Sequence, residues 1–118
     1  MQRPGAFVFV VVVDAAAARE IDDVLASIVE PEAVAVVVPQ SRADRCGLAY
    51  EFVDAWITLQ VHSALDAVGL TAAVSTALAA SGIPCNVLAG FHHDHLLVPS
   101  DRAQDALGIL EELSRGTA

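Results

Sequence analysis

Three histidines surround an acidic residue near the end of the sequence: His92 and His93 precede Asp94, and His95 follows it. Such groups can bind zinc, but a zinc site needs three or four ligands that converge at about 2.0–2.1 Å for nitrogen, which neighbours in one turn rarely achieve. Alternatively, Asp94 accepts backbone N–H bonds in a hairpin bend while the histidines lie at a subunit interface. A third interpretation is ligand contact, in which Asp94 binds an amine and neutral imidazoles bind a carboxylate. We expect no metal site, and the other two interpretations stay open.

A second candidate lies where a strand ends and a helix begins, at His62 and Ser63. Ser63 is a favourable N-terminal cap. The first N–H groups of a helix have no partner within it, which suits an anionic ligand group. Gly69 lacks a side chain, so a ligand or a second backbone could approach the helix there. Close helix packing through Gly69, Ala72 and Ala73 explains the same glycine equally well.

The sequence carries no recognisable catalytic motif. It lacks the GxSxG, HExxH and GxxxxGK(S/T) patterns, and it contains no lysine that could form a Schiff base. His62 and Ser63 are adjacent, and adjacent strand residues point to opposite faces, so they make a poor base and nucleophile. We therefore expect a protein that is not an enzyme, with a metal-dependent hydrolase as the most remote alternative.

Charge and composition exclude several classes of partner. The chain has 118 residues with 15 acidic and 6 basic side chains, and its formal net charge is −9. Nucleic acids and anionic membrane surfaces need a basic face, so neither is expected as a partner. No apolar run reaches the ~18 residues of a membrane span, and no signal peptide is recognised. Cys46 and Cys85 have no CxxC partner, and a disulfide between the two stays open. Nothing else in the sequence indicates secretion, so a reducing cytoplasm is the expected compartment.

The second half of the sequence predicts strands and helices that position these residues. The expected elements are a strand at 55–61, a helix between Ser63 and Ser81, strands at 84–91 and 95–98, and a helix at 101–113. The short connection between the last two strands predicts an antiparallel hairpin. The helical crossover of roughly 20 residues predicts that the first two strands run parallel. This order is the ferredoxin-like α+β pattern, βαββα, without its final strand.

The first half offers additional strands at residues 6–13 and 33–38. Residues 6–13 contain no polar side chain, so we expect this strand to be buried on both faces. Apolar residues at helical spacing predict a helix at 19–28, and Ser41 could cap another helix at 42–47. One of the two strands could complete the sheet of the second half, either within the chain or from a second copy.

The stretch from Val61 to Pro99 resembles a known family. It consists of VHSALDAVGLTAAVSTALAASGIPCNV followed by LAGFHHDHLLVP, and it is similar to the ACT domain group with the signature VHSSLEAVGLTAAVS…NVxAGxxHDHxFVP. Upstream, IVEPEAVAVVV resembles a strand of that group's first module, although Ala33 replaces its usual glycine. The layout is also similar to the ACT pairs of the animal cytosolic arginine sensor and of aspartate kinase regulatory regions. Aspartate kinases often place an asparagine ligand where this chain has Pro84, so no ligand identity carries over.

The resemblance implies a ferredoxin-like ACT fold, with a degenerate ACT-like half at residues 1–50 and an ACT domain at residues 51–118. It also implies a non-catalytic regulatory module that senses an amino acid or a similar small molecule, as a homodimer and without a cofactor. The alternative function is a structural interaction or dimerisation domain that has lost its ligand site.

The predicted ligand site combines the helix start with the hairpin. If the strands at 55–61 and 84–91 run parallel, the loops that follow them lie at the same end of the sheet, where open α/β sheets gather ligands. Helix N–H groups and Asp94 would together match the carboxylate and the amine of an amino acid. The residues assigned to this site are His62, Ser63, Val68, Gly69, Leu70, Thr71, Gly90, Phe91, His92 and Asp94.

Overall fold

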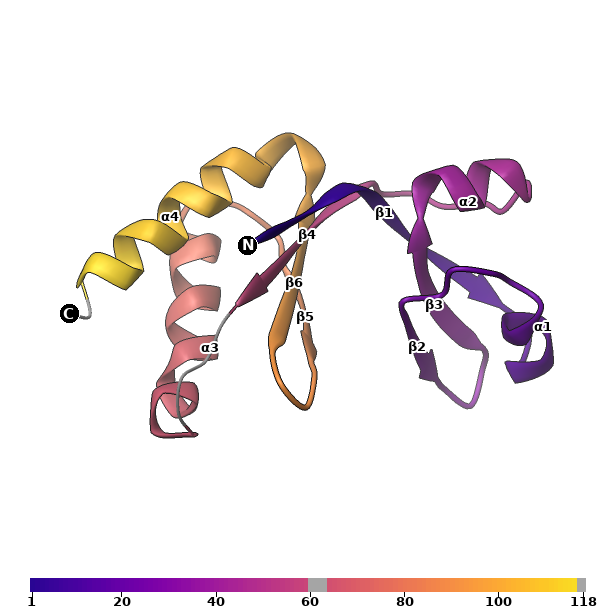
Figure 1. The fold of residues 1–118 in the computed structure, drawn as a ribbon, viewed down its shortest axis with the longest axis horizontal. Helices are drawn as coiled ribbons and strands as arrows, with labels where there is room; N and C mark the ends of the chain where they lie inside the picture. Colours follow the sequence, from indigo (N-terminus) through magenta and orange to yellow (C-terminus); the bar gives the residue numbers. More distant parts are fainter. Residues whose placement is uncertain (60–63, 117–118) are drawn as a thin grey trace. The chain divides into compact units, whose positions relative to one another are not determined.

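The computed structural model describes residues 1–59 and 64–116, and for residues 64–68 and 115–116 it describes the backbone alone. The chain divides into two compact units (Figure 1). Unit 1 comprises Met1–Pro4 together with Ala55–Ala118, and unit 2 comprises Gly5–Asp54. Strand β1 (Gln2–Val12) therefore contributes residues to both units.

Unit 1 contains the strand–helix–strand–strand–helix order that the sequence predicts. Its elements after β1 are β4 (Asp54–Leu59), α3 (Ala64–Ala80), β5 (Asn86–Ala89), β6 (Asp94–Pro99), a 3-10 turn at Ser100–Arg102, and α4 (Ala103–Gly116). The strand order in this unit is β1-β4-β6-β5, and β5 pairs with β6 in an antiparallel hairpin. This arrangement confirms the ferredoxin-like α+β fold.

The strand that the βαββα pattern lacks comes from the beginning of the same chain. The amide N of Thr58 donates to the carbonyl of Met1 at 2.8 Å, and the N atom of Met1 donates to the carbonyl of Thr58 at 2.8 Å. Two residues that exchange both hydrogen bonds form an antiparallel pair. The first residues of β1 thus complete the sheet of unit 1 in cis, which answers the question that the sequence left open.

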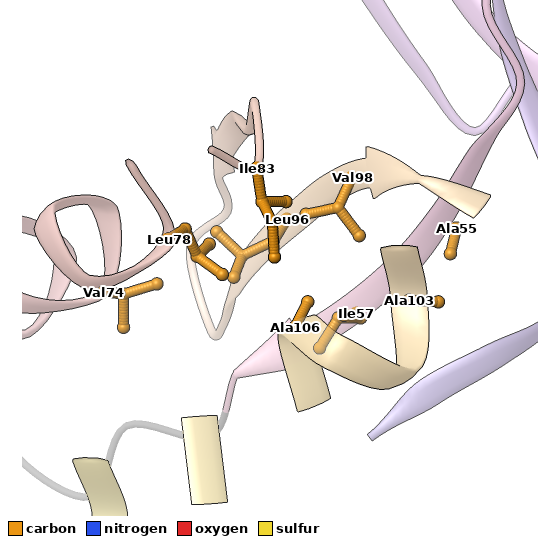
Figure 2. Packing of buried hydrophobic residues seen from close by; sticks show 9 residues of the cluster. All are labelled: Ala55, Ile57, Val74, Leu78, Ile83, Leu96, Val98, Ala103 and Ala106. Carbon is orange, nitrogen blue, oxygen red and sulfur yellow. The ribbon is translucent and has the colours of Figure 1, made fainter. Parts of the chain in front are cut away.

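The hydrophobic core of unit 1 lies between its strands and the two long helices, which cover the same face (Figure 1). Alternate residues of β4 and β6 point toward this core, because neighbouring strand residues face opposite sides. Figure 2 shows its buried members, which are Ala55, Ile57, Val74, Leu78, Ile83, Leu96, Val98, Ala103 and Ala106. The small side chains of Ala103 and Ala106 allow α4 to approach the sheet closely. Leu78 is fully buried, and such burial contributes about 1.5–3 kcal/mol.

Helix α3 ends where the sequence predicts, just before Ser81 and Gly82. Gly82 adopts a φ of +71°, in the left-handed region that favours glycine. The amide of Ile83 donates to the carbonyl of Leu78 at 3.0 Å, which satisfies one of the last helical carbonyls. Among the described helices, none combines the length and the apolar character that crossing a membrane requires.

Unit 2 has a similar but smaller arrangement. It contains part of β1, α1 (Ala15–Arg19), β2 (Ala26–Val29), β3 (Val34–Pro39) and α2 (Gln40–Arg45). The strand order is β2-β3-β1, and both neighbouring pairs are antiparallel. The buried core contains Val8, Val10, Val34, Val36, Val38 and Ala43. The side chain of Asp14 caps α1 by accepting from the amide of Ala17 at 2.9 Å.

The helix predicted at 19–28 is wrong. Helix α1 ends at Arg19, Asp23 adopts a left-handed φ of +65°, and Ala26–Val29 forms a strand on the edge of the unit 2 sheet. Ile21 and Val24 still pack against the core of unit 2, so they produced an apolar spacing typical of a helix. The following β-branched residues pair with β3 instead, and this tertiary pairing outweighs the local pattern.

The start of α2 also differs from the prediction, and the start of α4 resembles that of α2. Ser41 lies inside α2, and Ser100 opens a 3-10 turn that precedes α4. In both places the cap position is a proline, Pro39 or Pro99, with no side-chain hydrogen bond. Each proline ends its strand, and the chain turns directly into the helix at the next residue.

The first strand was predicted to be buried on both faces, but this holds for only part of its length. Phe7 and Val8 point to opposite faces and are both buried, but Val11 is 70% exposed. The helices and loops of unit 2 pack on the face that carries Val8 and Val10. The continuous apolar run therefore leaves part of one sheet face open.

Candidate functional site

Asp94 joins the hairpin of unit 1 to helix α3. It is the first residue of β6, and the alternation that directs Leu96 and Val98 into the core directs Asp94 to the same, helix-covered face. The hydroxyl of Thr71 on α3 donates to Asp94 Oδ2 at 3.4 Å, and both residues are half-buried. At this length the hydrogen bond is weak, so the carboxylate can form a stronger bond with an added donor.

Gly90 is required by close packing within the hairpin. Its amide donates to the carbonyl of His93 at 2.9 Å. A Cβ at position 90 would lie 2.8 Å from that carbonyl oxygen and 3.3 Å from Nε2 of His95. A side chain would therefore displace the backbone that carries Asp94, so Gly90 supports the position of this carboxylate.

The predicted site residues at the start of α3 are only partly visible. His62 and Ser63 lie outside the described residues, and Val68 belongs to the part of α3 whose backbone alone is described. Leu70 packs against the core of unit 1. A Cβ added at Gly69 would have no atom within 4 Å. Close helix packing therefore does not explain Gly69 in the described structure, and the space beside it is open.

The middle of the hairpin points outward. Phe91 is 98% exposed, and its ring contacts that of His92 edge-on at 4.9 Å between centroids. His92 and His93 are exposed as well. Structure thus brings Thr71, Gly90 and Asp94 into one region, whereas Phe91 and His92 lie at its surface.

No metal cluster is found in the described part of the chain. Within these residues, no three histidine, cysteine, aspartate or glutamate side chains are close enough together to bind one ion. The three histidines near Asp94 spread apart instead. The rings of His93 and His95 have centroids 6.4 Å apart at an interplanar angle of 75°.

A second group of polar side chains lies on the opposite face of the unit 1 sheet, and the sequence analysis did not find it. Indole Nε1 of Trp56 donates to Thr58 Oγ1 at 3.2 Å and to Nδ1 of His95 at 3.3 Å, and Thr58 Oγ1 lies 3.0 Å from the same Nδ1. The guanidinium of Arg3 stacks over the Trp56 ring at 4.7 Å. The alternation of Trp56 and Thr58 was visible in the sequence, but their neighbours come from strands distant in the chain.

The surroundings of His95 lower the pKa of its imidazole below 6.5. The largest cause is burial, followed by the positive charges of Arg3 and His93, while Asp94 has the opposite effect. The hydrogen bonds agree with this direction, because an indole N–H can only donate and therefore needs an unprotonated Nδ1. The Trp56–His95 hydrogen bond therefore fits the neutral imidazole with its proton on Nε2.

Comparison with known sequence families identifies the fold. A model of the ACT domain matches residues 51–112, and a second ACT domain model matches residues 1–55. The chain belongs to the ACT domain family. ACT domains are in general regulatory modules that bind small ligands. No curated protein matches this ACT-domain chain.

Solved structures agree with this assignment. A Vibrio cholerae protein of unknown function, described as a possible transport protein, is 40% identical with a TM-score of 0.86, over 95% of this chain and 86% of that one. A protein from Agrobacterium tumefaciens is 19% identical with a TM-score of 0.66, over 92% and 82% of the two chains. The aspartokinase alpha and beta subunits give 18% identity and a TM-score of 0.60, over 91% and 90%. The last two likenesses concern the fold alone.

Proposed function

We propose that this ACT-domain protein is a non-catalytic regulatory module that binds a free α-amino acid in unit 1. The ligand would lie between the helix start at His62–Thr71 and the hairpin at Gly90–Asp94. The observation that carries the proposal is the Thr71–Asp94 hydrogen bond of 3.4 Å, because it places a half-buried carboxylate beside the first part of α3.

The chemistry of this region suits a zwitterion. Asp94 would bind the ligand's ammonium group, and N–H groups of the first turn of α3 would bind its carboxylate. The open space beside Gly69 leaves room for the ligand. A phosphate is a poor candidate, because Asp94 and the net charge of −9 would repel it.

The wider organisation belongs to the same proposal. We infer two modules, at residues 1–50 and 51–118, in a protein that acts in the cytoplasm as a homodimer without a cofactor. Both cysteines are free thiols, and Cys46 is exposed, which fits a reducing compartment. The exposed Phe91 and Val11 are apolar surface that a second copy could cover.

Binding can be tested by thermal unfolding in the presence of each of the twenty amino acids at millimolar concentration. A ligand at 100 times its Kd should stabilise the fold by about 2.7 kcal/mol. Asp94→Asn keeps the size and removes the charge, and loss of a charge-assisted hydrogen bond costs roughly 1.5–3 kcal/mol, or about tenfold or more in affinity.

The matched control is Asp101→Asn, an exposed aspartate in the 3-10 turn before α4. This variant should bind the amino acid as tightly as wild type. If Asp94→Asn retains full affinity, the ligand lies elsewhere and the placement is wrong. If none of the twenty amino acids raises the unfolding temperature, the ligand class is wrong.

A protein–protein interaction domain is the second candidate function, and Phe91 is the observation that favours it. A phenylalanine that is 98% exposed at a hairpin tip offers apolar surface that a partner could cover. This function predicts no thermal shift with any amino acid, together with a lower oligomer mass for Phe91→Ser than for wild type by light scattering.

A further inference from the structure

The face of the unit 1 sheet opposite to α3 and α4 carries a cluster of side chains that the proposed ligand site does not use. Arg3 of β1, Trp56 and Thr58 of β4, and His95 of β6 form this cluster, which we call the Trp56 cluster. Its members come from three neighbouring strands of the order β1-β4-β6. The ring centroids of Trp56 and His95 lie 5.3 Å apart, and Arg3 stacks over Trp56 at 4.7 Å.

The hydrogen bond from Trp56 to His95 requires an unprotonated Nδ1 on the imidazole. Nδ1 of His95 receives the indole N–H of Trp56 at 3.3 Å, and the hydroxyl of Thr58 can donate to the same atom at 3.0 Å. An imidazolium carries protons on both ring nitrogens and cannot accept either bond. Thr58 could turn its hydroxyl and accept from a protonated Nδ1, and it already accepts from the indole N–H of Trp56 at 3.2 Å, so protonation breaks the Trp56–His95 hydrogen bond in particular.

The geometry points to a proton-operated latch, in which protonation of His95 releases the first residues of β1 from β4. A proton on Nδ1 would point at the N–H of Trp56 and would place a positive charge beside the ring on which Arg3 stacks. Arg3 is exposed and can move away into solvent. Its departure removes the cation–π contact with Trp56.

Both disturbances act on the same short piece of strand. Arg3 follows Met1 by two residues, and the backbone of Met1 is bound to Thr58 through two hydrogen bonds of 2.8 Å. Thr58 is also the residue whose hydroxyl contacts His95. Met1–Pro4 is an edge segment in unit 1 and is held by β4 on one side only, so it can detach without breaking the pairing of β4 with β6.

The charged groups around His95 set the direction of the response. Arg3 and His93 disfavour the imidazolium, Asp94 favours it, and β5 places the uncharged Leu88 opposite His95. Because the folded-state pKa is below 6.5, the unfolded chain binds the proton more readily. The latch is therefore fully closed above pH 6.5 and opens as the pH falls through the folded-state pKa.

One other titratable group shares this face of β4. Asp54 is 7% exposed, and burial raises the pKa of its carboxyl. It lies two residues before Trp56, and side chains two apart on a strand share a face. A variant at His95 separates the two groups, since protonation of Asp54 does not depend on the imidazole.

Tryptophan fluorescence of the full chain between pH 8 and pH 5 tests the latch, because Trp56 is the single tryptophan. We expect one fluorescence step in wild type, with a midpoint below 6.5. His95→Asn supplies a neutral acceptor near Nδ1 at every pH, so the step should disappear. Arg3→Gln, at an exposed position, should raise the midpoint because it removes a charge that opposes protonation.

The amide of Thr58 provides a second measurement that reports on the strand itself. Its hydrogen bond to Met1 should protect it from hydrogen exchange above the midpoint, and its protection factor should fall below the midpoint in wild type. His95→Asn should keep the protection across the whole range. His93→Asn is the control imidazole, and it should keep the step while raising its midpoint slightly.

Three results would overturn the inference, and each is independent of ligand binding. A fluorescence step that survives in His95→Asn would assign the titration to another group, such as Asp54. A step that disappears in His93→Asn would assign it to that histidine. Thr58 protection that stays constant through the step would show that protonation does not release the strand.

Discussion

The two units share the same strand-to-helix connection but differ in the length of their first helix. Each contains a strand that ends in proline and continues into a helix, VVVPQSRA in unit 2 and LLVPSDRA in unit 1. The arginine of each stretch holds the turn that follows the unit's first helix. Arg42 Nη2 binds Oδ2 of Asp23 at 2.9 Å, and Arg102 Nη2 donates to the carbonyl of Ser81 at 3.2 Å.

The difference lies in how much helix precedes that turn. Helix α3 has 17 residues, whereas α1 has 5. The long helix runs past the hairpin of unit 1 and meets Asp94 through Thr71. At the equivalent place, the first residue of β3, unit 2 has the buried Val34. The comparison indicates that the strands and the second helix are sufficient for a compact module, while the long first helix and the acidic residue are additions specific to unit 1.

Substitutions at the first residues of β3 and β6, Val34 and Asp94, include the largest expected change in the free energy of unfolding. Val34→Asp places a carboxylate at a position that is 3% exposed, and an uncompensated buried charge costs about 3–5 kcal/mol. Asp94→Val should change the free energy of unfolding much less, because Asp94 is half-buried and makes a weak hydrogen bond. Urea denaturation measures both. Equal losses would mean that the two strand starts have similar environments.

The hairpin turns provide the second comparison. The amide of Glu30 donates to the carbonyl of Ala33 at 2.9 Å. In the other hairpin, the amide of Gly90 donates to the carbonyl of His93, also at 2.9 Å. Gly90→Ala should destabilise the protein by about 1–3 kcal/mol because the new methyl group overlaps the backbone. Glu30→Ala, at an exposed position, is the matched variant and should be nearly neutral in thermal unfolding. Similar midpoints for the two variants would contradict the close packing inferred at Gly90.

Substitutions in the turns that follow α1 and α3 give the smallest expected change in the free energy of unfolding. Gly82 and Asp23 both have left-handed φ values, +71° and +65°. Gly82→Ala should therefore cost roughly 1–2 kcal/mol. Asp23→Gly removes strain but also removes the contact with Arg42, so these effects oppose each other. Chemical denaturation should show a clear loss for the first variant and little change for the second. A large loss for Asp23→Gly would mean that the ion pair, and not the backbone conformation, holds this turn.

Local signals predicted the elements that depend on neighbours in sequence. Ser81 and Gly82 marked the end of α3, and Pro99 marked the end of β6, because glycine and proline restrict the backbone at their own positions. The helix expected at 19–28 failed, since Ile28 and Val29 are fixed by pairing with β3, a contact that periodicity does not report.

The candidate site likewise combines features that neighbours in sequence determine with contacts that only the folded structure creates. Asp94 and Gly90 were recognisable because a turn and a following strand surround them in sequence. The hydrogen bond between Asp94 and Thr71 was not predictable, because it depends on where α3 lies relative to the hairpin in the folded unit. The Trp56 cluster was missed because Arg3 and His95 lie far apart in the chain and meet only when β1 and β6 flank β4.

The shared strand β1 also has a consequence for the order of events during protein synthesis. Met1–Pro4, which complete the sheet of unit 1, leave the ribosome well before β4 and β6, which begin at Asp54 and Asp94. Until β4 emerges, these four residues have no strand to pair with in unit 1. Unit 2 can therefore assemble during translation, but unit 1 must wait for the C-terminal half before its sheet can close. A fragment limited to the region of the ACT domain match at 51–112 would lack this segment and would expose an edge of β4.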